Sequence, residues 1–386
     1  MKEADRHTDR IRVKPVATKQ VMKDFVNLPR MIYADSPYYV PDLDQDIIDT
    51  FDPRKNHGLE YSEVQPFVAY DREHKPVGRI AAIINRRANE KWGTRNVRFG
   101  LMEFIDDLQV SRALLEAVAE WGRAKGMTAM QGPLGIFDFD KEGMLVEDFD
   151  MMGSMVTIYN PPYYPEHMQQ LGFVKEVDWI QLQMEVPEVI PARYTRVANY
   201  VSQQMGLHVR KLTRKELLQD GYGHKIFNLL NLAYAPLFGY TEFTHQQIDD
   251  FLKRYVPLME MRMISAVEKD DGELIGVAVT MHSLSEALRK SQGKLWPRGW
   301  WHLLKAVKWK HEPKAEMLLI AVHPSYQGLG VNALFFTDLV EAFHQCGITW
   351  AETGPQLEDN WKELSQWKAL NPKPVKRRRC FTKRIE

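Results

Sequence analysis

The most constraining feature of the sequence is the stretch 317–347, where an apolar run, a glycine-containing turn and a helical pattern follow one another. The run Met317–Val322 is short and ends at His323-Pro324, which predicts a buried strand. The apolar residues that recur at helical spacing after the turn are Val331, Leu334, Phe335, Leu339 and Phe343. Gly347 is placed to end this helix. Free N–H groups converge at such a turn, so the stretch predicts an anion site.

The turn Gln327-Gly328-Leu329-Gly330 resembles motif A of the GNAT superfamily of N-acyltransferases. The family pattern is Gln or Arg, two residues, Gly, one residue, then Gly or Ala. Asn332 departs from it, because this position carries a side chain where the family has almost none. The resemblance implies that the loop binds the pyrophosphate of acyl-coenzyme A and that the preceding strand pairs with the pantetheine arm. The alternative is a plain strand–helix turn of another α/β protein.

The resemblance also implies a set of acyl-CoA-binding residues from the strand, the turn and the segment after the next strand. These are Ile320, Ala321, Val322, Gln327, Gly328, Leu329, Gly330, Val331, Asn332 and Asn360. In the family, the strand after the motif A helix splays away from its neighbour, and the resemblance implies the same splay here. Many family members use a tyrosine in the helix after these splayed strands as general acid. Here Trp367 lies in that region and no tyrosine does, so the role is unassigned and Trp367 is expected to pack in the core.

An internal repeat accompanies this stretch. The segment from Val110 to Gly126, followed by Gly132-Pro133, matches the segment from Val331 to Gly347, followed by Gly354-Pro355, at one common offset. The predicted fold class is therefore α/β with a mixed α+β sheet, built from two GNAT-like units in tandem. We expect a degenerate first domain, 1–187, a linker at 187–191 and an acyl-CoA-binding domain, 192–386. Asp106 and Asp107 stand where the glycine loop belongs in the first copy and would repel a pyrophosphate.

Composition excludes several classes of protein. Lysine plus arginine and aspartate plus glutamate are equal at 51 each, so no net field favours nucleic acid. Cys346 and Cys380 cannot form a disulfide framework or a metal cluster, and no metal-ligand spacing occurs. The charged N-terminus lacks the apolar core of a signal peptide, and no apolar run has transmembrane length. We expect a cytoplasmic protein without a metal, at most peripheral at the inner membrane surface.

Two segments are candidates for binding the substrate that accepts the acyl group. The long tract 132–173 contains Tyr159, Asn160 and Tyr163, which either line a substrate pocket or cover a core edge. The insertion 295–310 interleaves four tryptophans, Trp300 among them, with four basic residues. These aromatics either pack on the sheet while lysines reach the solvent, or contact a lipid or membrane surface. Tyr159, Asn160, Tyr163 and Trp300 are therefore the predicted substrate-binding residues.

The chemistry implied by the resemblance is transfer of an acyl group from acyl-CoA to an amine. A carboxylate can take the proton from the amine, and Glu352 and Glu358 are the candidates near the splayed strands. The GNAT-like group that the chain resembles includes bacterial ceramide synthases, which implies a small-molecule or lipid amine, such as a sphingoid base, as acceptor. Two alternatives are a non-catalytic acyl-CoA or lipid-binding protein and an aminoacyl-tRNA-dependent transferase. The zero net charge argues against the second, so no nucleic-acid partner is expected.

Overall fold

A computed structural model describes residues 11–309 and 311–385. The chain forms two compact units. Of the described residues, the first unit contains those up to Trp179 together with 288–300 and 376–385, and the second contains 180–287, 301–309 and 311–375. The division of the chain into independently folding domains 1–187 and 192–386 remains a prediction. Among the described residues, no helix combines the length and apolarity needed to cross a membrane.

The first unit is a mixed sheet with the strand order β1-β2-β3-β4-β5-β14. All neighbours are antiparallel except β4 and β5, which are parallel and joined through α4. Its elements are β1 (Arg12–Pro15), α1 (Lys19–Ile32), α2 (Asp44–Thr50), a 3₁₀ turn (His57–Glu60), β2 (Ser62–Tyr70), β3 (Pro76–Asn85), α3 (Arg86–Trp92), β4 (Asn96–Phe104), α4 (Leu108–Ala124), β5 (Ala129–Gly132), β6 (Met144–Leu145) and α5 (Tyr163–Gln170). Asp107 caps α4, because its carboxylate accepts from the N–H of Gln109 at 2.8 Å.

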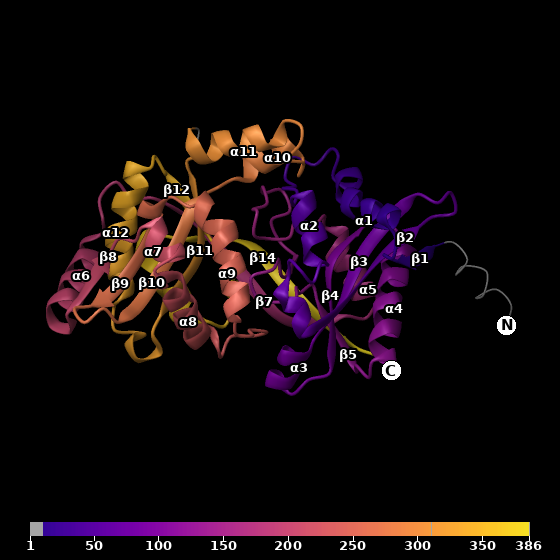
Figure 1. The fold of residues 1–386 in the computed structure, drawn as a ribbon, viewed down its shortest axis with the longest axis horizontal. Coiled ribbons are helices and arrows are strands. Elements are labelled where there is room, and N and C mark those ends of the chain that lie inside the picture. The colour runs from indigo at the N-terminus through magenta and orange to yellow at the C-terminus, as the bar shows by residue number, and fades with distance from the viewer. Residues whose placement is uncertain (1–10, 310, 386) are drawn as a thin grey trace. The chain divides into compact units, whose positions relative to one another are not determined.

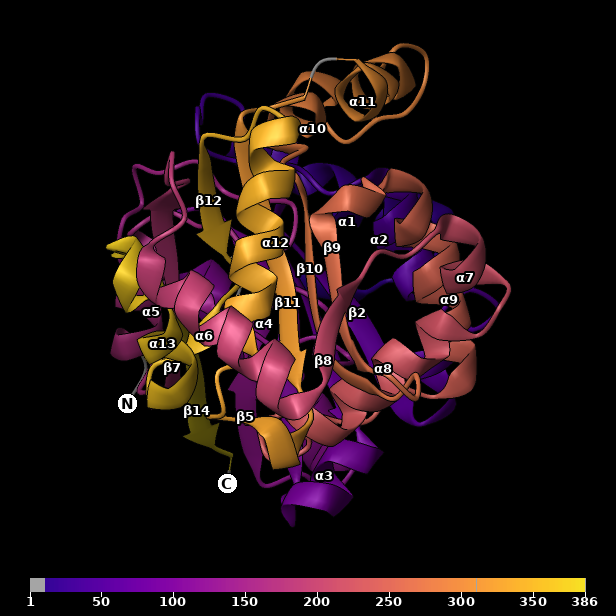
Figure 2. The same cartoon turned by 90° about the vertical axis from the view of Figure 1, so that its left-hand side faces the viewer.

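The second unit repeats this plan with the strand order β8-β9-β10-β11-β12-β7. Again only one neighbouring pair is parallel, β11 with β12, and it is joined through α12. Its elements are α6 (Ala192–Met205), β8 (Leu207–Arg210), α7 (Arg214–Leu218), α8 (Tyr222–Tyr234), α9 (His245–Tyr255), β9 (Ile264–Lys269), β10 (Leu274–His282), β11 (Lys314–Val322), α12 (Asn332–Gln345), β12 (Trp350–Thr353), β13 (Gln356–Leu357) and α13 (Trp361–Gln366). Short 3₁₀ turns lie at 256–258, 261–263, 324–326 and 368–370. Figure 2 shows α12 and α6 on one side of this sheet and α7, α8 and α9 on the other.

Four elements contain residues of both units. They are β7 (Val174–Glu185), α10 (Ser285–Ser291), α11 (Gly299–Lys308) and β14 (Lys373–Arg384).

The last strand of each sheet comes from the other half of the sequence. β14, at the C-terminal end, pairs with β5, so that Phe381 lies opposite Gly132 (Figure 1, yellow). β7 follows the first repeat in sequence, yet its end pairs with β12, with Glu185 opposite Trp350. Phe381 packs in the core of the first unit, and Leu182 and Met184 pack in the core of the second. The two halves of the sequence therefore exchange their final strands.

Candidate functional site

The site is organised by an irregularity in β11. Val279 of β10 lies opposite Leu319 while Thr280 lies opposite Met317, so Leu318 is the extra residue of a β-bulge. The pairing of β11 with β12 ends at Met317 and Thr353, although β11 continues to Val322. A bulge bends the strand that carries it, which separates β11 from β12 beyond this point. The predicted splay of these strands is present.

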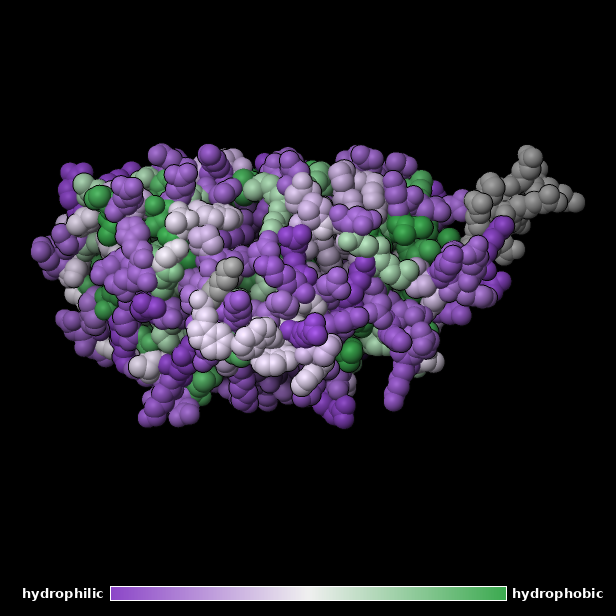
Figure 3. Space-filling model, turned by 90° about the horizontal axis from the view of Figure 1, so that it is seen from above, coloured by the Kyte–Doolittle hydropathy of each residue, from purple (hydrophilic) through white to green (hydrophobic). Residues whose placement is uncertain are grey.

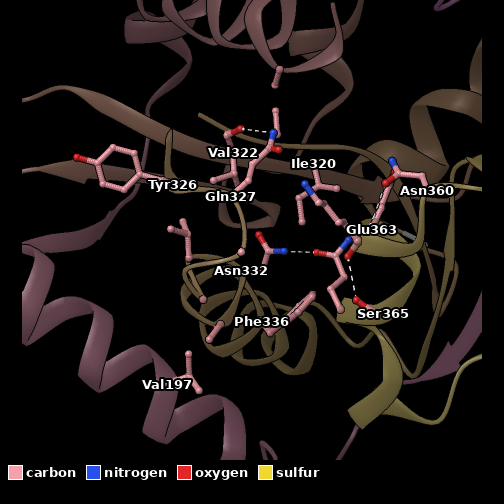
Figure 4. A pocket seen from close by; sticks show the side chains of 18 of the residues that line it. Val197, Ile320, Val322, Tyr326, Gln327, Asn332, Phe336, Asn360, Glu363 and Ser365 are labelled. Atoms are coloured by element: carbon pink, nitrogen blue, oxygen red, sulfur yellow. Dashed lines mark hydrogen bonds between the residues drawn. The ribbon is translucent and has the colours of Figure 1, made fainter. Parts of the chain in front are cut away.

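The open edge of β11 is contacted by two side chains. The hydroxyl of Tyr234, at the end of α8, donates to the carbonyl of Ile320 at 2.9 Å and accepts from its N–H at 3.4 Å. The side-chain amide of Gln327 donates to the carbonyl of Val322 at 3.1 Å (Figure 4). Ile320 and Val322 are two residues apart, so their backbone groups point to the same edge. A ligand that paired with this edge would have to displace both side chains.

The turn after β11 supplies donors at the start of α12. Gly328 and Gly330 have φ angles of +78° and +91°, which glycine adopts without strain. A Cβ at Gly330 would lie 2.6 Å from Cγ1 of Val197 in α6, whereas one at Gly328 would meet open space. Within residues 11–309 and 311–385, the amides of residues 328, 330, 331 and 332 donate to no protein acceptor. The turn therefore offers a set of amides at the positive end of a helix.

The strand edge and the turn open into one cavity of about 590 Å³ in the second unit. Of the ten predicted acyl-CoA-binding residues, all except Leu329 line it. Leu329 is 49% exposed, and its N–H donates to Tyr326 within the turn at 3.3 Å. The roles of all ten residues stay predictions.

Asn332, the residue that departs from the family pattern, has its side chain accommodated at the cavity wall. Its side-chain amide donates to Oε1 of Gln366 in α13 (Figure 4), so the two helices are bridged across the cavity wall. The side chain lies beside the turn amides and leaves the glycine turn intact. A ligand that passes between α12 and α13 would meet this bridge.

The wall formed by α13 contains a carboxyl group with an unusual proton affinity. Asn360 caps α13, and its amide also donates to Oε2 of Glu363 at 2.9 Å. Glu363 is only partly exposed and densely surrounded by protein, and this desolvation raises its pKa to about 7. Arg193, Lys362 and Lys368 line the same cavity and provide positive charge. Glu363 can therefore exchange a proton near neutral pH.

The two predicted catalytic glutamates lie elsewhere in the second unit. Glu352 in β12 is buried, 3.1 Å from the Lys314 ammonium, and accepts from Gln181 at 2.9 Å. Glu358 is half-buried between β13 and α13. Neither lines the described cavity. Their catalytic roles stay predictions.

The predicted substrate residues make local contacts in the first unit. Asn160 is fully buried and bonds both backbone groups of Leu145, at 2.7 and 3.0 Å. The hydroxyls of Tyr159 and Tyr163 donate to the carbonyls of Phe149 and Phe104. Trp300 is 43% exposed, and its indole N–H donates to Pro297 at 3.1 Å. Their roles in substrate binding also stay predictions.

Other expectations about single residues can be compared with the structure. Trp367 is 1% exposed and donates to Gln356 at 3.2 Å, which agrees with its expected packing role. Asp107 at the first repeat's turn serves as a helix cap. Among the described residues, no group of three or more His, Cys, Asp or Glu side chains is placed to hold a metal ion.

Sequence reasoning missed Tyr234 and Glu363. Tyr234 is far from the motif in sequence, and nothing local marks it. Glu363 carried a signal, because Asn360 and Glu363 have the spacing of a capping pair at the start of a helix. Residues three apart share a helix face, so Glu363 belonged beside Asn360.

Comparison with known proteins identifies the fold. No model of a known protein family matches the sequence. The chain is 28% identical over 320 residues to the bacterial ceramide synthase of Caulobacter vibrioides, covering 82% of this chain and 81% of that one. It is 27% identical over 387 residues to protein YghO of Escherichia coli, covering 97% and 95%.

Solved structures share the architecture at low sequence identity. A tandem GNAT protein from the clavulanic acid biosynthesis pathway matches with a TM-score of 0.55 and 13% identity, over 97% of this chain and 99% of that one. A GCN5-related N-acetyltransferase from Sphaerobacter thermophilus matches with a TM-score of 0.51 and 10% identity, over 98% and 96%. The chain therefore has the tandem GNAT fold, which confirms the prediction from motif A and the internal repeat.

Proposed function

We propose that this protein is an acyltransferase that moves an acyl group from acyl-CoA to an amine. One observation carries the proposal: the turn amides of residues 328, 330, 331 and 332, which donate to no acceptor in the described part of the chain, and the splayed edge of β11 open into a single cavity. The tandem GNAT fold and the similarity to a ceramide synthase support acyl transfer in general. The acyl-CoA dependence and the amine acceptor are parts of the proposal.

The residues present fit the parts of acyl-CoA. The turn amides and the dipole of α12 suit a pyrophosphate, and the missing Cβ of Gly330 lets the turn pack against Val197 of α6. Arg193, Lys362 and Lys368 add positive charge at the cavity wall. The backbone of Ile320 and Val322 can bond the amides of the pantetheine arm once Tyr234 and Gln327 rotate away.

Acyl-CoA supplies an acyl group activated as a thioester. In the transfer, the amine nitrogen forms a bond to the acyl carbon, the carbon–sulfur bond breaks, and the sulfur takes up a proton. We assign the donation of that proton to Glu363, because it lines the cavity and its pKa of about 7 keeps part of it protonated at neutral pH. It would take the role that the family gives to a tyrosine.

The acceptor that we propose is an amine with a long hydrocarbon chain. The support is the 28% identity to a ceramide synthase over most of both chains. Glu352 remains our candidate for receiving the amine proton, although its carboxylate is already held by Lys314 and Gln181. Of the alternatives, a non-catalytic acyl-CoA-binding protein would use the same cavity. An aminoacyl-tRNA-dependent transferase is disfavoured by the zero net charge.

The test compares two glycines of the turn. Wild-type protein at a hundredfold excess of acyl-CoA over its Kd should gain about 2.7 kcal/mol of unfolding free energy. Gly330→Ala should lose this gain, because the new Cβ collides with Val197 and shifts the turn. Gly328→Ala introduces similar backbone strain without a collision and should keep it.

Equal stabilisation of both variants by acyl-CoA would place the binding site elsewhere. Mass spectrometry of reactions with long-chain amines tests the transfer itself. Binding without an amide product from any amine would favour the non-catalytic alternative.

A further inference from the structure

The segment 294–309 carries an exposed aromatic and basic surface, which we name the tryptophan–lysine surface. It consists of Lys294, Trp296, Arg298, Trp300, Trp301, Lys305, Lys308 and Trp309. The tryptophans Trp296, Trp309, Trp301 and Trp300 are 80%, 64%, 48% and 43% exposed. Tryptophan carries a large apolar surface, and four exposed ones in one short segment bring much of it to the solvent.

The geometry of α11 gathers half of these residues on one stripe. Trp301, Lys305 and Lys308 of α11 and Trp309 directly after its end follow the spacing i, i+4, i+7, i+8. The N–H of Trp309 still donates to the carbonyl of Lys305 at 2.9 Å, so the four residues lie on one helical face. The rings of Trp301 and Trp309 lie 5.8 Å apart. Ala306, which falls outside this stripe, is buried. The helix therefore has one face that packs and another that presents tryptophan and lysine to the solvent.

Figure 3 looks onto the side of the molecule on which α11 lies. Where α11 lies in this view, pale residues of intermediate hydropathy, the class to which tryptophan belongs, gather beside strongly hydrophilic ones. The surface is therefore mixed in polarity rather than a purely apolar patch.

The charge of the segment has one sign. Residues 289–309 contain six lysines and arginines and no aspartate or glutamate. Within the described part of the chain, Lys294, Arg298, Lys305 and Lys308 form no ion pair with a carboxylate. A partner that covers the surface must therefore bring negative charge together with a layer that accepts indole rings.

We propose that the tryptophan–lysine surface binds the surface of an anionic lipid bilayer. Indole rings favour the headgroup level of a membrane, where one end of the ring is apolar and the other wet. Lysine and arginine on the same face meet anionic headgroups. α11 lies in the interface in this arrangement and does not cross the membrane. The inference concerns binding alone and does not require the proposed acyl transfer.

Vesicle flotation with the full-length protein tests the proposal. The probes are vesicles of phosphatidylcholine with and without phosphatidylglycerol. Wild-type protein should float with the anionic vesicles, more weakly at high salt, and much less with the neutral ones. Trp301→Ser/Trp309→Ser should bind about tenfold more weakly or worse, because the inserted apolar surface is lost. Lys305→Gln/Lys308→Gln should bind about 25-fold more weakly, at about fivefold per basic residue.

The matched control is Trp92→Ser, because Trp92 is 40% exposed on α3, outside the surface, and also lies beside a lysine. It should bind like the wild type. Circular dichroism and thermal unfolding establish that each variant is folded. We expect all of them to fold, because the substituted residues are exposed. As a second measurement, bromine-labelled lipids should quench wild-type tryptophan fluorescence more than that of the Trp301/Trp309 variant.

Three outcomes would overturn the proposal. They are wild-type protein that ignores anionic vesicles, equal binding by all variants, and concentration-dependent self-association through this surface without vesicle binding. The last would assign the surface to a second copy of the chain.

Discussion

The hydroxyl of Tyr234 satisfies both backbone groups of Ile320, donating to its carbonyl at 2.9 Å and accepting from its N–H at 3.4 Å. Strand edges left open by a neighbour normally find water, another strand or a ligand. Here one side chain at the end of α8 fills that role where the strands have separated. Tyr234 therefore competes with any ligand that pairs with β11.

Tyr234→Phe should lower the stability of the protein and raise its affinity for acyl-CoA. Loss of the hydroxyl should lower the unfolding free energy by about 1 kcal/mol, and removal of the competitor should tighten acyl-CoA binding by about fivefold. Denaturant unfolding and calorimetric titration measure the two effects. Tyr240→Phe is the matched control, because Tyr240 donates to Asn231 at 2.8 Å and lies outside the cavity wall. Weaker binding by Tyr234→Phe would mean that the hydroxyl contacts the ligand.

Glu363→Gln should change the pH dependence of the protein. Burial raises the pKa of Glu363 from 4.5 to about 7, so the unfolded chain releases this proton first as the pH rises. The wild type should therefore lose unfolding free energy between pH 4.5 and 7 relative to Glu363→Gln, with no further change above pH 7. Urea titrations across this range measure the difference. If the difference in unfolding free energy between the wild type and Glu363→Gln stayed constant from pH 4.5 to 7, the pKa of Glu363 would not be raised.

The same variant tests the catalytic role of Glu363. Proton donation by Glu363 should fall above pH 7 as the group ionises, and the rate of acyl transfer should fall with it. Glu363→Gln should lose about 10²-fold or more in rate and lose this descending limb. Calorimetric titration of acyl-CoA at each pH separates the rate from affinity. An unchanged pH–rate profile would remove Glu363 from the chemistry and leave the acyl-CoA site intact.

Phe381→Ala tests the exchange of final strands. Phe381 is 1% exposed in β14, opposite Gly132 of β5, so its truncation should destabilise the first unit by about 3–5 kcal/mol. Hydrogen exchange should accelerate at residues 129–132 rather than at 264–282. Phe343→Ala is the counterpart, because Phe343 is 4% exposed in the core of the second unit and should show the reverse pattern. Acceleration in the second unit by both variants would place β14 in that unit.

The sequence by itself determined the features that depend on neighbouring residues. The apolar run, the glycines and the helical periodicity of 317–347 predicted β11, the turn and α12, because strand, turn and helix preferences act over a few residues. The repeat predicted that two similar α/β units occur in tandem. The role of Gly330 in the turn was predicted from a family pattern, and its φ of +91° gives the physical reason for a glycine at this position.

Only the tertiary structure decided which distant residues meet. Tyr234 reaches Ile320 because α8 packs against β10 and β11, and no local pattern encodes that contact. The exchange of β7 and β14 was hidden because a strand's pattern specifies which face is buried but not which neighbour it pairs with. The pKa of Glu363 likewise depends on desolvation by surrounding segments. Local preferences fixed the elements of this protein, whereas long-range packing selected their partners and the proton affinities in the cavity.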